Sequence, residues 1–292
     1  MDLLAYHQSL HYRASDQTFF YDHSRDDKPD PRSFKPHYEK GYEVFLFISG
    51  SGSYMIEGTK YELEPYSILL MNSNELHAID ISEHEPYERI VLSIRESFSL
   101  PFMLSGVDFF RTIKYRDLGH DNQIPPRIVL ENGLIDLFGK LSHLLTTANP
   151  ENEIVAKCVI VQMLSTINRI AETNKTRMKR RSNNKTGAVL AHINANLEEP
   201  LSLDVLSEKF YMTKYHLCRT FKETTGFSIN QYITYKRIHL ADTLMSKGSS
   251  PTQACFMSGF NSYSNFFRSY RKLTGKSPRS GHRTRHSGDD ND

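Results

Sequence analysis

The sequence has no tryptophan and only three cysteines among its 292 residues. Cys158, Cys218 and Cys255 are far apart and form no Cys-x-x-Cys pair, which argues against a disulfide framework or a thiolate zinc site. The N-terminus has no basic stretch followed by an apolar core, so no secretion signal is expected. No run of 18 apolar residues is present, so we expect no membrane span. These absences predict a cytoplasmic protein.

A large net charge is also lacking, because the chain carries only +2 at pH 7. That small value hides an asymmetry. Residues 1–174 hold 16 Lys and Arg against 25 Asp and Glu, whereas residues 175–287 hold 20 against 6. A basic segment of this strength suits a polyanion, and nucleic acid is the first candidate. A solvated basic surface with no partner is the plain alternative.

The acidic part of the chain begins with short β-rich segments. Residues 36–95 contain apolar runs separated by Gly, Pro and Asn, a pattern typical of an all-β sandwich or barrel. Residues 44–48 are apolar at every position, so this strand is predicted to be covered on both faces.

From about residue 127 the apolar spacing changes to the three- and four-residue steps of amphipathic helices. One stripe runs from Leu134 to Leu145, and Asn149 and Pro150 interrupt it. The second predicted stripe consists of Ile154, Cys158, Val161, Leu164 and Ile167. These two helices either cover the barrel or pair with a second copy of the chain, so a homodimer stays open.

The basic part begins with a polar segment, residues 174–187, which reads as a linker and either is a solvated tether or adds contacts to phosphates. The segments after it are helical in pattern. The chain is therefore predicted to have five parts: a barrel (1–126), a helical pair (127–173), a basic linker (174–187), a helical domain (188–282) and a tail (283–292).

One basic helix occurs twice in the helical domain. The stretch TKYHLCRTFKETTG, residues 213–226, returns 49 positions later as SYSNFFRSYRKLTG, residues 262–275. Each copy has a Thr or Ser where a helix N-cap belongs and a Gly where a helix ends. Each copy also has an apolar pair on one face and two cations on another. The apolar pairs are Leu217 with Phe221 and Phe266 with Tyr270, and the cations are Arg219 with Lys222 and Arg268 with Arg271.

A short helix, a tight turn and a capped basic helix, seen twice, predict two helix-turn-helix units whose second helices enter the major groove of DNA. Arg219 and Arg268 can bind guanine or hold phosphates, and Lys222 and Arg271 are expected to hold phosphates. Two units on one DNA face contact enough base pairs for sequence specificity. A helical repeat used for protein contacts is the alternative, and the basic charge argues against it.

Residues 188–279 resemble the DNA-binding domain of AraC/XylS-type bacterial transcription regulators. The matching stretches are LSLDVLSEKFYMTKYHLCRTFKETTGFSINQYI, KRIHLADTLM and GFNSYSNFFRSYRKLTGKSP. The resemblance implies base contacts from both repeated helices. Lys214, Lys222 and Arg271 are included because they lie on the same two helices. The predicted DNA-binding set is Lys214, Tyr215, Cys218, Arg219, Lys222, Tyr263, Ser264, Phe267, Arg268 and Arg271.

The N-terminal part carries a spacing similar to that of cupin barrels. His37, Glu39, Glu43 and Gly50 follow the pattern His-x-His-x3-Glu-x6-Gly with Glu39 in place of the second His, and His77 falls where the second cupin motif places a ligand. The resemblance to AraC-type sensor domains, which usually hold a small effector, implies that His37, Glu39, Glu43 and His77 line an effector pocket. Two alternatives stay open, a transition-metal site and purely structural residues. We predict no metal and no cofactor.

These patterns together predict an α+β multidomain protein, with a cupin-like β-barrel and two-helix segment followed by an all-α double helix-turn-helix domain. We interpret it as a sequence-specific transcription regulator and not an enzyme, since no hydrolytic triad, phosphate loop or redox cysteine pair is evident. The alternative is a metal-dependent cupin enzyme fused to a DNA-binding domain. The expected partners are double-stranded promoter DNA, a small-molecule effector and, for an activator, RNA polymerase, with no membrane contact.

Overall fold

The computed structural model describes residues 9–31, 34–147, 149–175 and 185–278. The chain divides into two compact units, residues 1–181 and 182–292, and each is described by itself. A unit of strands and helices followed by a helical unit confirms the predicted α+β class. The finer predicted boundaries stay predictions. Most of the predicted linker and all of the predicted tail lie outside the described residues.

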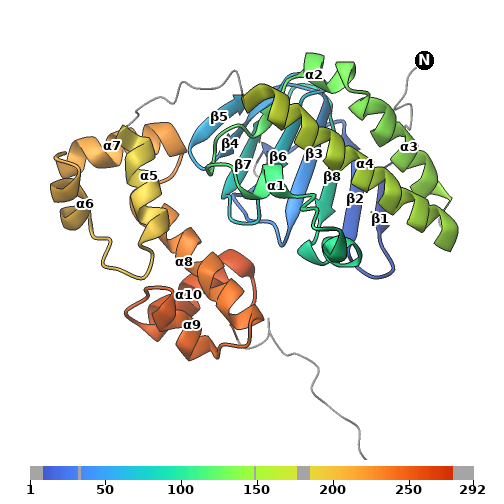
Figure 1. Ribbon diagram of the computed structural model, residues 1–292. Helices are drawn as coiled ribbons and strands as arrows, with labels where there is room; N and C mark the ends of the chain where they lie inside the picture. The colour runs from blue at the N-terminus through green and yellow to red at the C-terminus, as the bar shows by residue number, and fades with distance from the viewer. Residues whose placement is uncertain (1–8, 32–33, 148, 176–184, 279–292) are drawn as a thin grey trace, which may run out of the picture. The chain divides into compact units, whose positions relative to one another are not determined.

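The N-terminal unit contains two antiparallel sheets. The larger has six strands in the order β1-β2-β8-β3-β6-β9, and the smaller has three in the order β5-β4-β7 (Figure 1). The two sheets pack face to face as in a cupin-like barrel, because one apolar cluster takes residues from both. The strands are β1 (Leu10–Arg13), β2 (Phe19–Asp26), β3 (Tyr42–Ser49), β4 (Gly52–Ile56), β5 (Thr59–Glu62), β6 (Ile68–Met71), β7 (His77–Ile81), β8 (Tyr87–Ile94) and β9 (Gln123–Ile124).

Strand β3 is covered on both faces, as its apolar sequence predicts. Phe45 and Phe47 face the core between the two sheets. Val44 and Leu46 face the opposite way and join the core beneath the helices. Because successive side chains of a strand point to opposite faces, a strand between two cores must be apolar at both sets of positions.

Three strands lie outside the predicted β-rich range of residues 36–95. Strand β9 follows it, and β1 and β2 precede it, with β2 paired to β8 from Phe19 opposite Ile94 to Asp26 opposite Tyr87. The second half of β2 is polar, and its inward His23 is buried against Glu88. A buried histidine interrupts the apolar alternation by which a strand is recognised, and this explains the missed strand.

Helices cover one face of the six-stranded sheet (Figure 1). They follow a 3-10 segment at Glu96–Ser105 and are α1 (Arg111–Lys114), α2 (Pro126–Glu131), α3 (Leu134–Thr146) and α4 (Pro150–Lys175). The predicted stripe of α3 is confirmed, since Leu134, Phe138, Leu141 and Leu145 are buried.

The predicted stripe of α4 is wrong in its first turns. Ile154 and Cys158 are exposed, and the buried face is one position away. Glu153 occupies the inward position of the first turn, where its carboxylate accepts hydrogen bonds from Tyr12 and Ser15. Because the inward residue of the first turn is charged, the apolar spacing of the sequence pointed to the wrong face of α4. The buried stripe consists of Ala156, Val159, Ile160, Met163, Leu164, Ile167 and Ile170.

By length and composition, α4 is apolar enough over Pro150–Thr173 to cross a membrane. Half of its most apolar window is buried inside the unit, where it packs on α3 and on the sheet. Core packing therefore accounts for the apolar character of this helix.

The C-terminal unit is helical. Its helices are α5 (Lys185–Ala195), α6 (Leu203–Lys209), α7 (Lys214–Thr225), α8 (Ile229–Ser246), α9 (Pro251–Met257) and α10 (Tyr263–Thr274). Short polar residues begin most of them: Ser228 and Ser250 form reciprocal capping boxes with Gln231 and Gln253. The long α8 contributes to the core of both helix-turn-helix units, through Tyr232 against Phe221 and in the cluster around Phe266.

Contacts between the halves of this unit involve the loop that follows α5. The Arg237 side chain on α8 donates to the backbone oxygens of Leu197 and Glu199 at 2.9 and 2.8 Å. Gly259, in the turn between α9 and α10, also approaches the Leu197 oxygen, which a β-carbon at this position would meet at 2.1 Å. These contacts tie the loop of the first half to α8 and to the second turn.

Candidate nucleic-acid interface and ligand site

Helix α7 separates an apolar face from a polar one. Leu217 and Phe221 are buried in the unit, as predicted. Thr213 caps the helix by accepting a hydrogen bond from the His216 amide at 3.3 Å, and Gly226 ends it in the left-handed conformation at φ 76°. The caps and the buried pair fix the helix, so its outer face is presented in a defined orientation.

The predicted DNA-binding residues of α7 lie on that outer face, except that Cys218 is half-buried. Tyr215 is the most prominent of them, with 75% of its surface exposed. Arg219 is exposed and its Nε donates to the Glu223 carboxylate at 2.8 Å. Lys214 pairs with Asp204 of α6, and Lys222 is exposed. Two of the cations therefore hold acidic partners that DNA would have to replace.

Helix α10 repeats this design without acidic residues. Phe266 and Tyr270 are buried, and the Tyr270 hydroxyl donates to Asp242 of α8 at 2.6 Å. Gly275 ends the helix at φ 70°. Ser262 occupies the predicted N-cap position, but its side chain makes no capping hydrogen bond. Its backbone is more extended, at φ −147°, than that of Thr213 at −67°.

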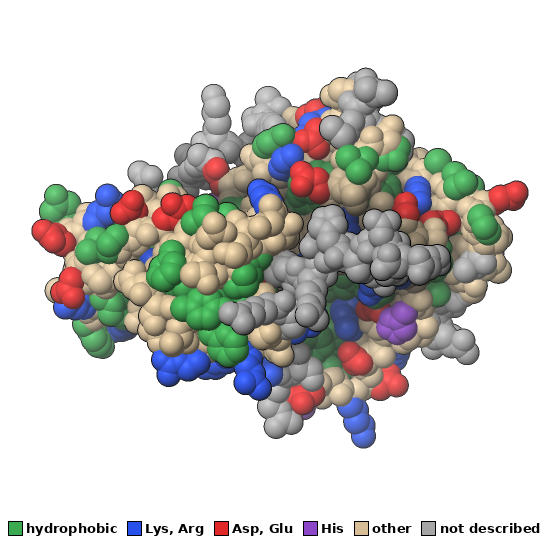
Figure 2. All heavy atoms as spheres, turned by 90° about the horizontal axis from the view of Figure 1, so that it is seen from below, with side chains coloured by type: hydrophobic (Ala, Val, Ile, Leu, Met, Phe, Trp, Pro, Cys, Tyr) green, Lys and Arg blue, Asp and Glu red, His purple; other side chains and the backbone are tan. Residues whose placement is uncertain are grey.

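The predicted residues of α10 differ in exposure. Ser264, Arg268 and Arg271 are exposed, whereas Tyr263 and Phe267 are half-buried and contact each other or Phe266. Figure 2 shows Lys and Arg side chains gathered beside hydrophobic side chains at one edge of the C-terminal unit.

Three exposed residues of α10 were absent from the predicted set, Asn265, Lys272 and Thr274. Asn265 accepts a hydrogen bond from the Arg268 guanidinium, and Lys272 adds a third cation. The 49-residue offset gives no signal for Lys272, because it corresponds to the acidic Glu223 of the first copy.

The N-terminal unit brings the four predicted ligand residues together. His37 and His77 lie opposite each other across an isolated antiparallel bridge, with backbone N-to-O distances of 3.0 and 3.2 Å. Their ring centroids are 4.5 Å apart. Glu39 lies beside them, with its Oε1 3.4 Å from His37 Nε2, and Glu43 is buried at the start of β3. Residues 40 positions apart in the sequence therefore share one site.

Both imidazole rings have a fixed orientation. The Nδ1 of His37 donates to the Lys35 backbone oxygen at 2.8 Å, and the Nδ1 of His77 donates to the Glu75 oxygen at 2.9 Å. A carbonyl oxygen can only accept, so Nδ1 carries the proton in each ring. His77 is fully buried, and its Nε2 has no hydrogen-bond partner.

The electrostatics of this cluster are those of a partly enclosed site. Burial, aided by the neighbouring His37, lowers the pKa of His77 to about 4. Burial, aided by the charge of Glu39, raises the pKa of Glu43 to about 8. Glu43 is therefore protonated at neutral pH and able to donate a hydrogen bond to Glu39, whose pKa lies below its usual range despite burial because His37 stabilises the anion.

A second buried network positions His77. The Arg116 guanidinium makes a bidentate pair with the Glu75 carboxylate, with both N-to-O distances at 2.7 Å. The same carboxylate accepts from the Gly119 and Asn72 amides. Because Glu75 also accepts the His77 Nδ1 proton through its backbone oxygen, this network fixes the histidine. The sequence analysis missed it, since the partners are more than 40 residues apart.

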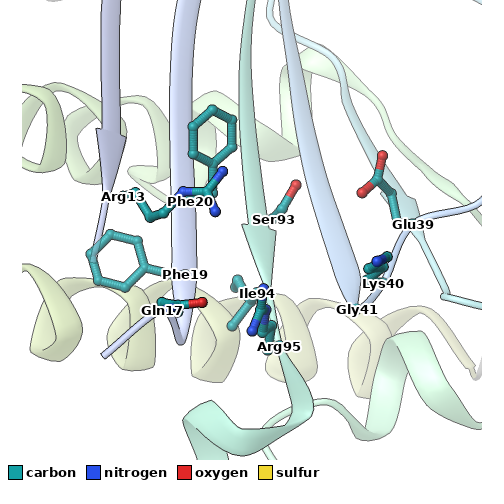
Figure 3. Close-up of a pocket in the computed structure, with 10 residues that line it drawn as sticks. All are labelled: Arg13, Gln17, Phe19, Phe20, Glu39, Lys40, Gly41, Ser93, Ile94 and Arg95. Carbon is teal, nitrogen blue, oxygen red and sulfur yellow. The ribbon is translucent and has the colours of Figure 1, made fainter. Parts of the chain in front are cut away.

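A shallow cavity of about 190 Å³ lies next to Glu39 at one end of the six-stranded sheet. Figure 3 shows Arg13, Phe20 and Ser93 on one side of it and Glu39 and Lys40 on the other. The side chain of Glu39 therefore borders both this cavity and the histidine pair.

Comparisons with known proteins agree with this division of the chain. Residues 24–157 match the model of an AraC-like ligand binding domain, and residues 206–283 match a helix-turn-helix domain. The multiple antibiotic resistance protein MarA of Escherichia coli is 34% identical over 85 residues, which are 29% of this chain and 67% of MarA. This chain belongs to the AraC family of DNA-binding transcription regulators.

Other similar proteins share parts of this AraC-family chain. The probable transcriptional regulator LumQ of Photobacterium leiognathi is 31% identical over 88 residues, which are 30% of this chain and about a third, 36%, of LumQ. The structure of fatty-acid-bound ToxT from Vibrio cholerae is 16% identical, covering 92% of this chain and 96% of ToxT, with a TM-score of 0.41. The predicted family is confirmed, and the comparisons give no support to the alternative of a metal-dependent cupin enzyme.

Proposed function

We propose that this AraC-family regulator reads promoter DNA by placing α7 and α10 in successive major grooves. One observation carries the proposal. Each helix buries an apolar pair in the unit and exposes arginine and a second cation on another face. Because α8 takes part in the cores of both halves, the two helices are held by one scaffold. Half-sites about 34 Å apart on one face of DNA suit such an arrangement.

The outer residues divide into two roles. Arg219 and Arg268, near the middle of their helices, are assigned to base edges, where an arginine can bind guanine bidentately. Lys222 and Arg271, one turn later, are assigned to phosphates. Tyr215, Ser264 and the half-buried Cys218, Tyr263 and Phe267 complete the base-facing surface, and Lys214 completes the phosphate contacts.

The test is selection of preferred sites from genomic DNA by the full chain, followed by fluorescence anisotropy on selected and random duplexes. We expect Arg219→Ala to weaken binding to the selected site by about 10- to 100-fold and to affect random DNA less. Lys140→Ala removes an exposed cation from α3 and serves as the charge-matched control. The proposal fails if no site is preferred or if Arg219→Ala changes neither affinity.

The effector is assigned to the N-terminal unit, at the site formed by His37, Glu39, Glu43 and His77. A ligand there can regulate DNA binding only as far as it favours one arrangement of the chain over another. Differential scanning fluorimetry against a panel of small molecules and ions tests this assignment, because a ligand at 100 times its Kd adds roughly 2.7 kcal/mol of stability.

Because the proposed regulator acts on bacterial promoter DNA, we propose that it works in the cytoplasm. If it is an activator, RNA polymerase is a further partner, and transcription in vitro with purified polymerase would measure that role.

A homodimer would use the exposed side of α4, where Ile154, Val155 and Cys158 face solvent. Sedimentation of Ile154→Asp against the unchanged chain tests the dimer.

A further inference from the structure

The sequence favoured no metal ion at the predicted ligand residues, but from the geometry we propose that His37, Glu39 and His77 form a binding site for one divalent transition-metal ion. The nitrogen and oxygen atoms that these three side chains offer all lie within 4.8 Å of one another. Around Zn²⁺, bonds of about 2.0–2.2 Å place neighbouring ligand atoms roughly 3–3.5 Å apart. The 3.4 Å between His37 Nε2 and Glu39 Oε1 already meets this spacing. Small side-chain movements would bring the third donor to the same distance.

The tautomers of both rings suit a metal ion. Each histidine donates its Nδ1 proton to a backbone oxygen, that of Lys35 for His37 and that of Glu75 for His77. The Nε2 lone pair of His77 is thereby left as an available donor. The Nε2 of His37 faces the Glu39 carboxylate, and a bound ion would take the place of the proton between these two atoms. Metal-ligating histidines almost always show this outer hydrogen bond, because it fixes the ring and raises its basicity.

An independent observation is the unpartnered Nε2 of His77. The residue is fully buried, and among the described residues its Nε2 is one of few buried side-chain atoms without a hydrogen-bond partner. A buried acceptor without a partner destabilises the folded state. The atom belongs to the group of donors that includes Glu39 and His37, so an ion held by this group would satisfy it.

The backbone makes the arrangement stiff. His37 and His77 exchange both backbone hydrogen bonds across their bridge, which holds the two rings on the same side. The Arg116–Glu75 pair fixes the segment that leads into His77. A prearranged set of donors loses little conformational entropy on binding an ion.

The donor set selects the class of ion. Two imidazole nitrogens and one carboxylate suit zinc, iron, nickel or copper, whereas magnesium and calcium prefer sites made only of oxygen. The His37 side chain is 48% exposed, so solvent or a small anion could complete the coordination from that side. If the effector binds this site, as the proposed function assigns it, then the effector is the metal ion or a ligand bound through the ion; this consequence rests on the proposed function.

Titration of chelator-treated full-length protein with Co²⁺, followed by its visible absorption bands and by competition with Zn²⁺, tests the site. We expect one ion per chain and at least 100-fold weaker binding in His37→Ala and in Glu39→Gln. His37 and Glu39 are partly exposed, so these changes are compatible with folding, and far-ultraviolet circular dichroism verifies it. His84→Ala removes an exposed histidine outside the cluster and should bind Co²⁺ like the unchanged chain.

The proposal is overturned if the unchanged chain shows no Co²⁺ bands, or if folded His37→Ala and Glu39→Gln proteins keep the original affinity. It is also overturned if His84→Ala loses binding to the same degree, since the ion would then sit elsewhere. The assay contains no DNA, so failure here leaves the DNA-binding proposal untouched, and failure of the anisotropy test leaves this one untouched.

Discussion

The two units of the chain use charged side chains in opposite ways. In the N-terminal unit, acids and bases are buried and paired, as in Glu75 with Arg116 and in the cluster around His77. In the C-terminal unit Lys236 of α8 is buried, but the cluster around Phe266 is apolar and the cations of α7 and α10 stand in solvent. Buried charges require fixed partners, whereas exposed charges can exchange theirs. This difference agrees with the proposal that the first unit holds a ligand among buried groups and that the second contacts DNA.

Breaking one ion pair in each unit gives the largest expected contrast. Glu75→Ala leaves Arg116 buried without its partner, which should lower the free energy of unfolding by about 3–5 kcal/mol. Glu223→Ala removes the partner of Arg219 in solvent and should change stability too little to measure. Hydrogen exchange of peptides from β6–β8 and from α7 in the full chain measures each region separately. Equal effects would refute the comparison.

A substitution in the turn between α9 and α10 is expected to have the next largest effect on stability. Gly259 has φ 87°, and a β-carbon there would lie 2.1 Å from the Leu197 oxygen. Gly259→Ala should therefore cost about 2–3 kcal/mol, by strain and by displacement of the loop. Gly248→Ala is the control, because its φ is 99° but no atom lies within 4 Å of the added carbon.

Urea unfolding of the full chain, followed by the helical circular dichroism signal, measures both glycine variants. The control should lose only about 1 kcal/mol, which isolates the contribution of the close approach to Leu197. If the two variants lose the same amount, the loop is not held as tightly as the structure indicates.

The pH dependence of the N-terminal unit is a smaller effect. Burial alone would raise the pKa of Glu153, but hydrogen bonds from Tyr12 and Ser15 and the pair with Lys157 lower it from 4.5 to about 2. The folded pKa is depressed, so the stabilisation is complete above pH 4.5 and is lost as the pH falls toward 2. We expect a loss on the order of 1–2 kcal/mol over this window.

Thermal unfolding between pH 5 and pH 2, with hydrogen exchange of peptides from β1 and α4, checks this. Glu153→Gln should remove most of the slope in those peptides. The C-terminal unit, whose Arg219–Glu223 pair is exposed, should show little slope from that pair. A slope in Glu153→Gln equal to that of the unchanged chain would contradict the assignment.

The same contrast explains how much could be predicted from the sequence. Helices with an apolar inner face, such as α3, α7 and α10, follow from residue spacing, because their inward positions are apolar. Strand β2 and the first turns of α4 do not, because His23 and Glu153 are inward and polar. The grouping of His37, Glu39 and His77 was suggested by spacing, but their tautomers and the orphaned Nε2 require the fold.

The N-caps of α7 and α10 provide the smallest and most local test, within the C-terminal unit itself. Thr213 accepts a hydrogen bond from the His216 amide, whereas Ser262 occupies the same place without a capping bond. Thr213→Ala should cost about 1 kcal/mol, and Ser262→Ala close to nothing. Urea unfolding, with hydrogen exchange of peptides from α7 and α10, separates the two. If Ser262→Ala costs as much as Thr213→Ala, then both helices are capped alike in solution, and the two halves differ only in the charges that they present to DNA.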